Sequence, residues 1–254
     1  ICVPTPIRNK KPDLTFLKEA TKLVAKKVKP FDTIVYESTV YPGTTEEVCC
    51  PIIERISKLK VNKNFYLGYS PERINPGLNT KKISTIKKII SGSSKKALME
   101  IRNVYKPVIS AGLFSAKSIK VAESAKIIEN TQRDINIALM NEFSKILNKL
   151  NINTNHVLSA AKTKWNFNDY YPGLVGGHCI GVDPYYLAYK AKKIGIDPKV
   201  ILAGRKVNDG MANYFSNYFL NNLKKKKIKK KSKVLILGAT FKENISDIRN
   251  SKIL

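Results

Sequence analysis

Residues 115–150 include neither proline nor glycine, and this stretch constrains the fold more than any other part of the chain. Because these two residues most often end a helix, their absence predicts one continuous helix of up to 36 residues. Helices of globular proteins average only about 11–12 residues. A helix this long is typical of a connector between domains or of a subunit interface, although its apolar stripe would also serve for packing within one chain.

Strand and helix signals alternate before this helix, which is typical of a parallel sheet with crossover helices. The predicted strands are 1–3, 33–36, 65–69, 88–91 and 108–110, and the predicted helices are 13–28, 46–59 and 94–105. After the long helix, the predictions are helices at 154–162, 185–194 and 199–223, a glycine-rich loop at 172–181 and a strand at 233–237. We therefore expect an α/β domain at 1–114, a central helical domain at 115–212 and the start of a second α/β domain at 213–254.

The charge balance is strongly basic, with 46 lysines and arginines against 19 acidic residues and a formal net charge of +27. Such a balance is typical of proteins that bind nucleic acid. However, 39 of these cations are lysines spread along the whole chain, whereas surfaces that read bases favour arginine. We expect no nucleic-acid partner. We also expect no membrane partner, because no run of 18 apolar residues predicts a span.

The four cysteines do not form a disulfide or zinc pattern. Cys49 and Cys50 are adjacent, no C-x-x-C motif occurs, and this usage fits a reducing, cytoplasmic compartment. Cys2, Cys49 and Cys50 lie in apolar segments and are predicted to be buried. With only two histidines in the chain, we expect no metal site.

Cys179 differs from the other cysteines, because glycines and His178 surround it. Gly176 and Gly177 let the backbone approach a ligand closely, and a cysteine in such a loop is accessible, as a nucleophile must be. Asp183 follows four residues later. Taken alone, Asp183 before a proline is typical of a helix N-cap, and both roles are compatible.

A polar stripe runs along the long helix among apolar residues. Its members are Glu123, Lys126, Asn130, Asp134 and Asn141. A solvated face is the default interpretation of such a stripe. Lys126 and Asn130, however, lie one turn apart and would point together at a ligand, and a lysine near a cysteine stabilises both a thiolate and an oxyanion.

Two further candidate segments follow predicted strands, where parallel sheets bind ligands. Ser38 and Thr39 come at the end of the strand at 33–36, and they are candidates either for ligand contacts or for capping the next turn. Glu72 and Arg73 follow the strand at 65–69 in a loop bracketed by prolines, either as catalytic residues or as an ion pair.

Together these segments resemble the UDP-glucose/GDP-mannose dehydrogenase family. The matching motifs are Val3-Pro-Thr-Pro6, Glu37-Ser-Thr39 with Pro42-Gly-Thr44, Ser70-Pro-Glu-Arg73, Glu123-x-x-Lys126-x-x-x-Asn130, Gly176-Gly-His-Cys179 with Asp183, and the run from Phe241 to Ser251 that contains Asp247 and Arg249. Within the family, the chain most resembles UDP-N-acetylglucosamine 6-dehydrogenases of surface polysaccharide synthesis. Order and spacing agree over essentially the whole chain.

The resemblance implies NAD as cofactor, a UDP-sugar substrate and a homodimer through the central helix. It implies that Cys179 is the nucleophile in a two-step oxidation of the sugar C6 hydroxyl, that Lys126, Asp183 and Asn130 handle protons, charge and orientation, and that Glu72 and Thr39 assist. Implied cofactor contacts are Thr5, Ser38, Thr39 and Arg249, and implied substrate contacts are Glu72, Arg73, Lys126, Asn130, Gly176, Gly177 and Lys242.

The chain departs from the family pattern by omission, because no Gly-x-Gly-x-x-Gly occurs in it. The resemblance therefore implies the second half of a Rossmann-like NAD domain, a helical dimerisation domain and the start of a second Rossmann-like domain. With isoleucine as residue 1, we expect an internal part of a longer protein that is inactive alone. Other UDP-sugars, a dehydrogenase without a catalytic cysteine and a polyanion-binding module stay open as alternatives.

Overall fold

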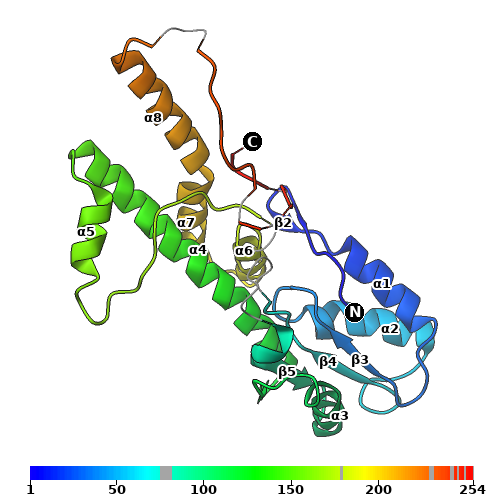
Figure 1. Ribbon diagram of the computed structural model, residues 1–254. Coiled ribbons are helices and arrows are strands. Elements are labelled where there is room, and N and C mark those ends of the chain that lie inside the picture. The colour runs from blue at the N-terminus through cyan, green and yellow to red at the C-terminus, as the bar shows by residue number, and fades with distance from the viewer. Residues whose placement is uncertain are drawn as a thin grey trace. The chain divides into compact units, whose positions relative to one another are not determined.

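The computed structural model describes residues 1–74, 82–177, 180–228, 232–240, 243–244, 246–248 and 250–253 (Figure 1). The chain divides into two compact units. The first comprises Ile1–Glu129 and Tyr185–Asp197, and the second comprises Asn130–Pro184 and Pro198–Leu254. Two helices, α4 (Ile119–Lys149) and α6 (Asp183–Lys193), contribute residues to both units.

A four-stranded sheet lies at the centre of the first unit. Its strands follow the order β3 (Thr33–Tyr36), β4 (Tyr66–Tyr69), β5 (Lys88–Gly92) and β6 (Leu113–Ser115). β3 pairs with β4 in parallel, as the sequence predicts. β5 pairs in parallel with β6, a strand that was not predicted, and β4 and β5 are antiparallel, which departs from the predicted parallel sheet. The described part of the connection from β4 to β5 holds only a short 3₁₀ helix, η2 (Ile83–Thr85), and parallel neighbours usually need a helical crossover.

Helices cover both faces of this sheet. The Tyr36 hydroxyl lies 2.9 Å from that of Thr21, so this side chain of β3 faces helix α1. On the opposite face, Thr33 and Val35 share a cavity wall with Ile101 of helix α3. The remaining elements of the first unit are the hairpin β1 (Ile7–Arg8) and β2 (Lys11–Pro12), the helices α1 (Thr15–Ala25), α2 (Cys50–Ser57) and α3 (Lys95–Tyr105), and the π-helix η1 (Thr44–Cys49).

The second unit is helical in its described part. Gly204 on α7 faces α4 so closely that a Cβ there would lie 3.4 Å from Ile135 and 3.6 Å from Ala138. The glycine therefore lets the two helices approach each other. The helices of this unit are the rest of α4, α5 (Thr154–Ala161), α7 (Lys199–Asp209) and α8 (Met211–Lys225).

The α/β fold class and the long helix are confirmed, although several boundaries differ. The helix predicted at 46–59 is divided into η1 and α2, with Pro51 in the first turn of α2, where proline is tolerated. The helix predicted at 199–223 is interrupted at Gly210, between α7 and α8.

Two strand predictions were wrong, and one was wrong in part. Residues 108–110 form turns, in which Ile109 N–H donates to the Tyr105 carbonyl and continues the end of α3. The run at 233–237 is irregular and exposed, because no strand lies beside it among the described residues. Residues 1–3 are not a regular strand, but Ile1 does exchange backbone hydrogen bonds with Val35 and Glu37.

The cysteine predictions are confirmed for two of the three apolar positions. Cys49 and Cys50 are buried, whereas Cys2 is exposed. Burial raises the pKa of each buried thiol to about 11, so both are neutral at physiological pH and act as small apolar side chains.

The N-cap of α3 provides a test of the fold. The Ser94 side chain accepts the Ala97 N–H at 3.1 Å, so we expect Ser94→Ala to lower the free energy of unfolding by about 1 kcal/mol. Ser124→Ala is the matched control, since this hydroxyl donates to the Lys120 carbonyl inside α4, where alanine is neutral or better. Urea unfolding measures both, and equal losses would contradict the assignment.

Candidate functional site

Hydroxyl groups fasten the first segment of the chain to the carboxyl end of β3. Ser38 Oγ accepts the Val3 N–H and donates to the Val3 carbonyl, each at 2.8 Å. Thr5 Oγ1 donates to the Thr39 carbonyl at 2.7 Å. Ser38 and Thr5 therefore build the rim of the predicted cofactor site through backbone contacts, while the Thr39 side chain is half-exposed there. The segments that flank the carboxyl end of β3 fit a nucleotide cofactor at this edge.

Helix α6 supports the same rim. The Tyr186 hydroxyl donates to the Thr5 carbonyl at 2.7 Å, and the Tyr186 side chain is fully buried. Lys190, one turn further along α6, pairs with Glu47 at 2.8 Å. The helix that begins at Asp183 thus helps to hold the segment expected to contact the cofactor.

An ion-pair interpretation requires Glu72 and Arg73 to pair with each other, but their side chains have other partners. Glu72 Oε1 accepts the N–H groups of Arg73 and Ile74 at 2.8 and 2.7 Å, which leaves Oε2 directed elsewhere. Arg73 instead pairs with Glu129 of α4 at 2.8 Å and donates to the Lys87 carbonyl. Arg73 therefore fastens the loop after β4 to the long helix.

Lys88 is a charged residue of this site that the sequence analysis missed. Its buried ammonium lies 3.0 Å from Glu37 Oε1 and 3.6 Å from Glu72 Oε2. Burial opposes the charge of Glu37, but the hydrogen bond from Tyr105 and the pairing with Lys88 outweigh it and hold the pKa of Glu37 below its usual value. A lysine at the start of an otherwise apolar strand was the available signal.

Glu123 of α4 has a different role from the solvated position that a polar stripe predicts by default. Its carboxyl group is fully buried and accepts the N–H groups of Gly43 and Thr45 at 2.5 and 2.9 Å. Gly43 has a φ of +94°, which favours glycine, and its turn begins η1. Burial raises the pKa of Glu123 to about 7, although the two N–H groups favour the charged form.

This raised pKa predicts a pH-dependent stability. The folded chain holds the Glu123 proton more tightly than the unfolded chain, so the contribution is complete below pH 4.5, the ordinary value, and is lost as the pH rises to about 7. We expect the stability of the wild type relative to Glu123→Gln to fall by about 3 kcal/mol over this window. Urea unfolding at several pH values measures it.

Glu142→Gln is the control for this experiment, because Glu142 is an exposed glutamate on the same helix. Its stability difference from the wild type should not change over the same window. If the Glu123→Gln difference were equally constant, Glu123 would not be a buried acid that titrates near neutrality.

The structure brings together two of the predicted catalytic residues. Asn130 Nδ2 on α4 donates to Asp183 Oδ2 at 2.5 Å, and Asp183, the first residue of α6, is 3% exposed. Lys126 lies one turn before Asn130 on α4 and is 9% exposed, so it too departs from the default of a solvated stripe. Asp134 and Asn141 of the same stripe are fully buried.

Several predicted residues lie outside the described part of the chain. They are His178, Cys179, Lys242 and Arg249. Gly176 and Gly177 come just before this cysteine, Gly177 has a φ of +81°, and its carbonyl accepts the Asn250 amide at 3.3 Å. The expected approach of Cys179 to Lys126 and Asn130 stays a prediction.

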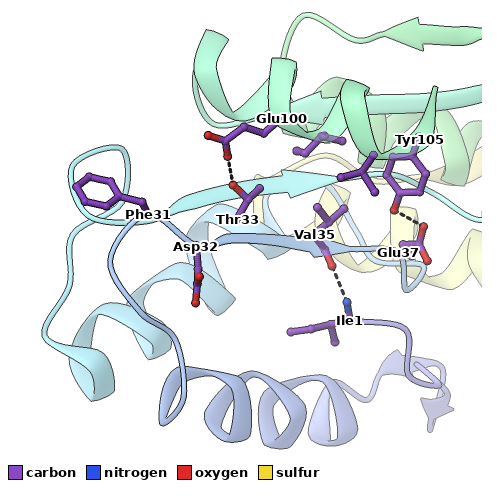
Figure 2. Close-up of a pocket in the computed structure, with 10 residues that line it drawn as sticks. Ile1, Phe31, Asp32, Thr33, Val35, Glu37, Glu100 and Tyr105 are labelled. Atoms are coloured by element: carbon purple, nitrogen blue, oxygen red, sulfur yellow. Dashed lines mark hydrogen bonds between the residues drawn. The ribbon is translucent and has the colours of Figure 1, made fainter. Parts of the chain in front are cut away.

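A cavity of about 570 Å³ lies between β3 and α3 (Figure 2). Figure 2 shows that hydrogen bonds close its walls, with Tyr105 donating to Glu37 at 2.6 Å and Thr33 to Glu100. None of the predicted catalytic or ligand-binding residues is among the lining residues, so we place the candidate site at the strand ends and not in this cavity.

Comparison with known proteins assigns two segments of the chain to two domains of one protein family. Residues 1–109 match the NAD binding domain of the UDP-glucose/GDP-mannose dehydrogenase family, and residues 120–210 match its central domain. The chain belongs to this family. The match confirms the predicted family and NAD as the cofactor of the first region, which agrees with the rim that Thr5, Ser38 and Thr39 form.

Three relatives show how far the similarity extends. The chain is 57% identical to a UDP-N-acetyl-D-glucosamine 6-dehydrogenase of Salmonella typhi and 52% identical to one of Pseudomonas aeruginosa, over its whole length and over 60% and 61% of those proteins. A solved structure of UDP-D-ManNAc dehydrogenase from Pyrococcus horikoshii is 33% identical, with a TM-score of 0.91 over 99% of this chain and 60% of that one. The chain thus spans about three fifths of these relatives.

Two features are absent from the described residues. No described helix combines the length and the apolar character needed to cross a membrane. No group of three or more histidine, cysteine, aspartate or glutamate side chains suited to a metal ion was found in the same residues.

Proposed function

We propose that this chain is part of an NAD-dependent UDP-N-acetylglucosamine 6-dehydrogenase of surface polysaccharide synthesis. The observation that carries the proposal is the pairing of Asn130 with Asp183. It places an amide of α4 against the carboxylate that closes the glycine-rich loop, and that loop contains Cys179 in the sequence. The identities of 57% and 52% to two such enzymes favour this substrate over the mannosamine isomer, because UDP-N-acetyl-D-mannosamine dehydrogenases of Methanococcus maripaludis and Pyrococcus horikoshii are only 38% and 33% identical.

The proposed reaction oxidises the C6 alcohol in two steps. NAD supplies the chemistry by accepting one hydride in each step. In the first step the hydroxyl loses its proton to a base, and the resulting aldehyde adds the Cys179 thiol as a thiohemiacetal. Loss of the second hydride leaves a thioester, and water then releases the carboxylate and the free thiol. The balance is one alcohol, one water and two NAD⁺ converted into one carboxylate, two NADH and three protons.

The residues on α4 and at the start of α6 would manage charge and protons. Lys126 would stabilise the alkoxide and the later oxyanions, and its ammonium would favour the thiolate of Cys179. Asp183 is the candidate base. Its pairing with Asn130 through Oδ2 holds this carboxylate in a fixed orientation at the start of α6.

The thioester-hydrolysis step would use the loop after β4. Glu72 is held by two backbone N–H groups through Oε1, so Oε2 is the oxygen left to direct a water. The buried Lys88 ammonium lies 3.6 Å from this oxygen and helps to hold the carboxylate in place. Thr39 would assist from the end of β3.

The remaining assignments complete the proposal. Thr5, Ser38, Thr39 and Arg249 are assigned to the cofactor, and Arg73, Gly176, Gly177 and Lys242 join the catalytic residues in the substrate site. We assign residues 1–114 to the NAD domain, 115–212 to the central domain and 213–254 to the start of the UDP-sugar domain. A homodimer through α4 is supported by its exposed apolar residues, which include Leu139, Phe143 and Ile146.

Because the relatives are longer, we propose that activity needs the segments they have beyond the matched span. The test uses this chain and a completed chain, in which those segments are taken from the Salmonella typhi relative. The completed chain should form two NADH per UDP-N-acetylglucosamine, and this chain none. One NADH per sugar would contradict a thioester route.

The nucleophile is tested with Cys179→Ser in the completed chain. A serine hydroxyl adds to the aldehyde poorly and leaves poorly, so we expect kcat to fall at least about 1000-fold while the KM for NAD changes little. Cys2→Ser is the control, because this cysteine is exposed and outside the proposed site. Equal activity of both variants would exclude covalent catalysis by Cys179.

A further inference from the structure

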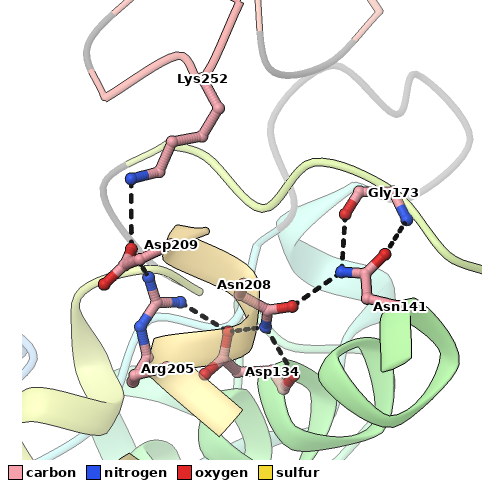
Figure 3. A network of polar contacts seen from close by, with 7 residues as sticks. All are labelled: Asp134, Asn141, Gly173, Arg205, Asn208, Asp209 and Lys252. Atoms are coloured by element: carbon pink, nitrogen blue, oxygen red, sulfur yellow. Dashed lines mark hydrogen bonds and ion pairs between the residues drawn. The ribbon is translucent and has the colours of Figure 1, made fainter. Parts of the chain in front are cut away.

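A buried ion pair in the second unit joins α4 to α7 (Figure 3). Arg205 Nη1 lies 2.7 Å from Asp134 Oδ1, and the two residues are 2% and 0% exposed. Asp134 Oδ1 also accepts the Asn208 amide at 2.7 Å, and the Asp134 backbone carbonyl accepts the same amide at 2.9 Å. The backbone carbonyl can only accept, and Asp134 Oδ1 already accepts from Arg205, so the Asn208 NH₂ group must face both oxygens.

The orientation of the Asn208 amide fixes that of the Asn141 amide. Because the Asn208 NH₂ faces Asp134, its Oδ1 faces Asn141, which donates to it at 2.8 Å. The second Asn141 N–H donates to the Gly173 carbonyl at 2.9 Å, and Asn141 Oδ1 accepts the Gly173 N–H at 2.8 Å. If the Asn141 amide were reversed, like groups would face each other at all three contacts.

Asn141 and Asn130 therefore hold the two ends of the glycine-rich loop. Asn141 pairs with Gly173 near its start, and Asn130 pairs with Asp183 at its end. The two asparagines are 11 residues apart, close to three turns of helix, so they lie on one face of α4 about 16 Å from each other. One rigid helix thus fixes the span that the loop must cross.

We propose that Asn141 is a positioning residue of the catalytic loop, held in its orientation by Asn208, Asp134 and Arg205. This inference rests on the proposed function, because the loop contains Cys179. Asn141 acts through Gly173 by keeping the loop in register with α4, on which Lys126 and Asn130 lie. It takes no part in bond making.

The test compares Asn141→Asp with Asn148→Asp in the completed chain. The aspartate at 141 has nearly the same shape but cannot donate to Gly173 or Asn208, whereas Asn148 lies on the same helix and donates to the Tyr214 hydroxyl, away from the loop. We expect kcat for Asn141→Asp to fall at least about 10-fold, since small displacements of reacting groups are costly. The KM for NAD should stay within about 2-fold, and Asn148→Asp should match the wild type.

Two further measurements keep the inference falsifiable. The rate at which iodoacetamide modifies Cys179, read by peptide mass spectrometry, should change at least about 3-fold in Asn141→Asp and not in Asn148→Asp. In the unmodified full chain, the Gly173 N–H should exchange with solvent at least about 100-fold slower than in an unstructured peptide. This last measurement needs no variant, so it also decides if Asn141→Asp fails to fold.

The outcomes separate this inference from the proposed function. No turnover by the completed wild-type chain would overturn the function, and with it any role in catalysis. Turnover with unprotected Gly173 N–H would overturn the inference alone. A folded Asn141→Asp variant whose kcat and Cys179 modification rate equal those of the wild type would also overturn it and leave Asn141 as a structural residue.

Discussion

The positions of the turn at Gly43 and of the loop at Gly173 depend on buried polar side chains of α4. These side chains pair with backbone groups that are distant in sequence. Glu123 holds the turn at Gly43, and Asn141 holds the loop at Gly173. Each of these side chains is fully buried, and burying a polar group without a partner costs several kcal/mol, so the turn and the loop must take up the positions that satisfy them. An apolar helix face would bury the same area, but it would not fix the position of the turn and the loop along α4.

The buried charged residues are also subject to the cost of burying a polar group. The Asp134–Arg205 pair is removed from water, and such pairs often add little net stability compared with apolar residues of similar volume. Its physical consequence here is directional, because Asp134 Oδ1 accepts from both Arg205 and Asn208, and the Asp134 backbone carbonyl accepts from Asn208 as well. Asp134 orients the Asn208 amide, and Asn208 in turn orients the Asn141 amide. The side-chain oxygen and nitrogen of Asn141 therefore face the loop in one fixed orientation.

Local signals in the sequence were enough for much of the fold and for part of the site. The strand β3 and the helix α4 follow from apolar runs and from the absence of glycine and proline, and the approach of Asn130 to Asp183 agrees with their motifs. The run at 233–237 shows the limit, because a strand exists only beside a partner. The partners of Lys88 and Glu123 could not be predicted for a similar reason, because they lie far away in the chain.

The choice of asparagine at both ends of the loop has an electrostatic reason. A carboxylate could accept the Gly173 N–H as well as an amide does, but it would repel the Gly173 carbonyl and add negative charge near the loop. Negative charge raises the pKa of a thiol, and a cysteine nucleophile reacts as the thiolate. Two neutral amides fix the loop without this cost. In the proposed mechanism Lys126, on the same helix, would favour the thiolate of Cys179 without a competing anion at position 141.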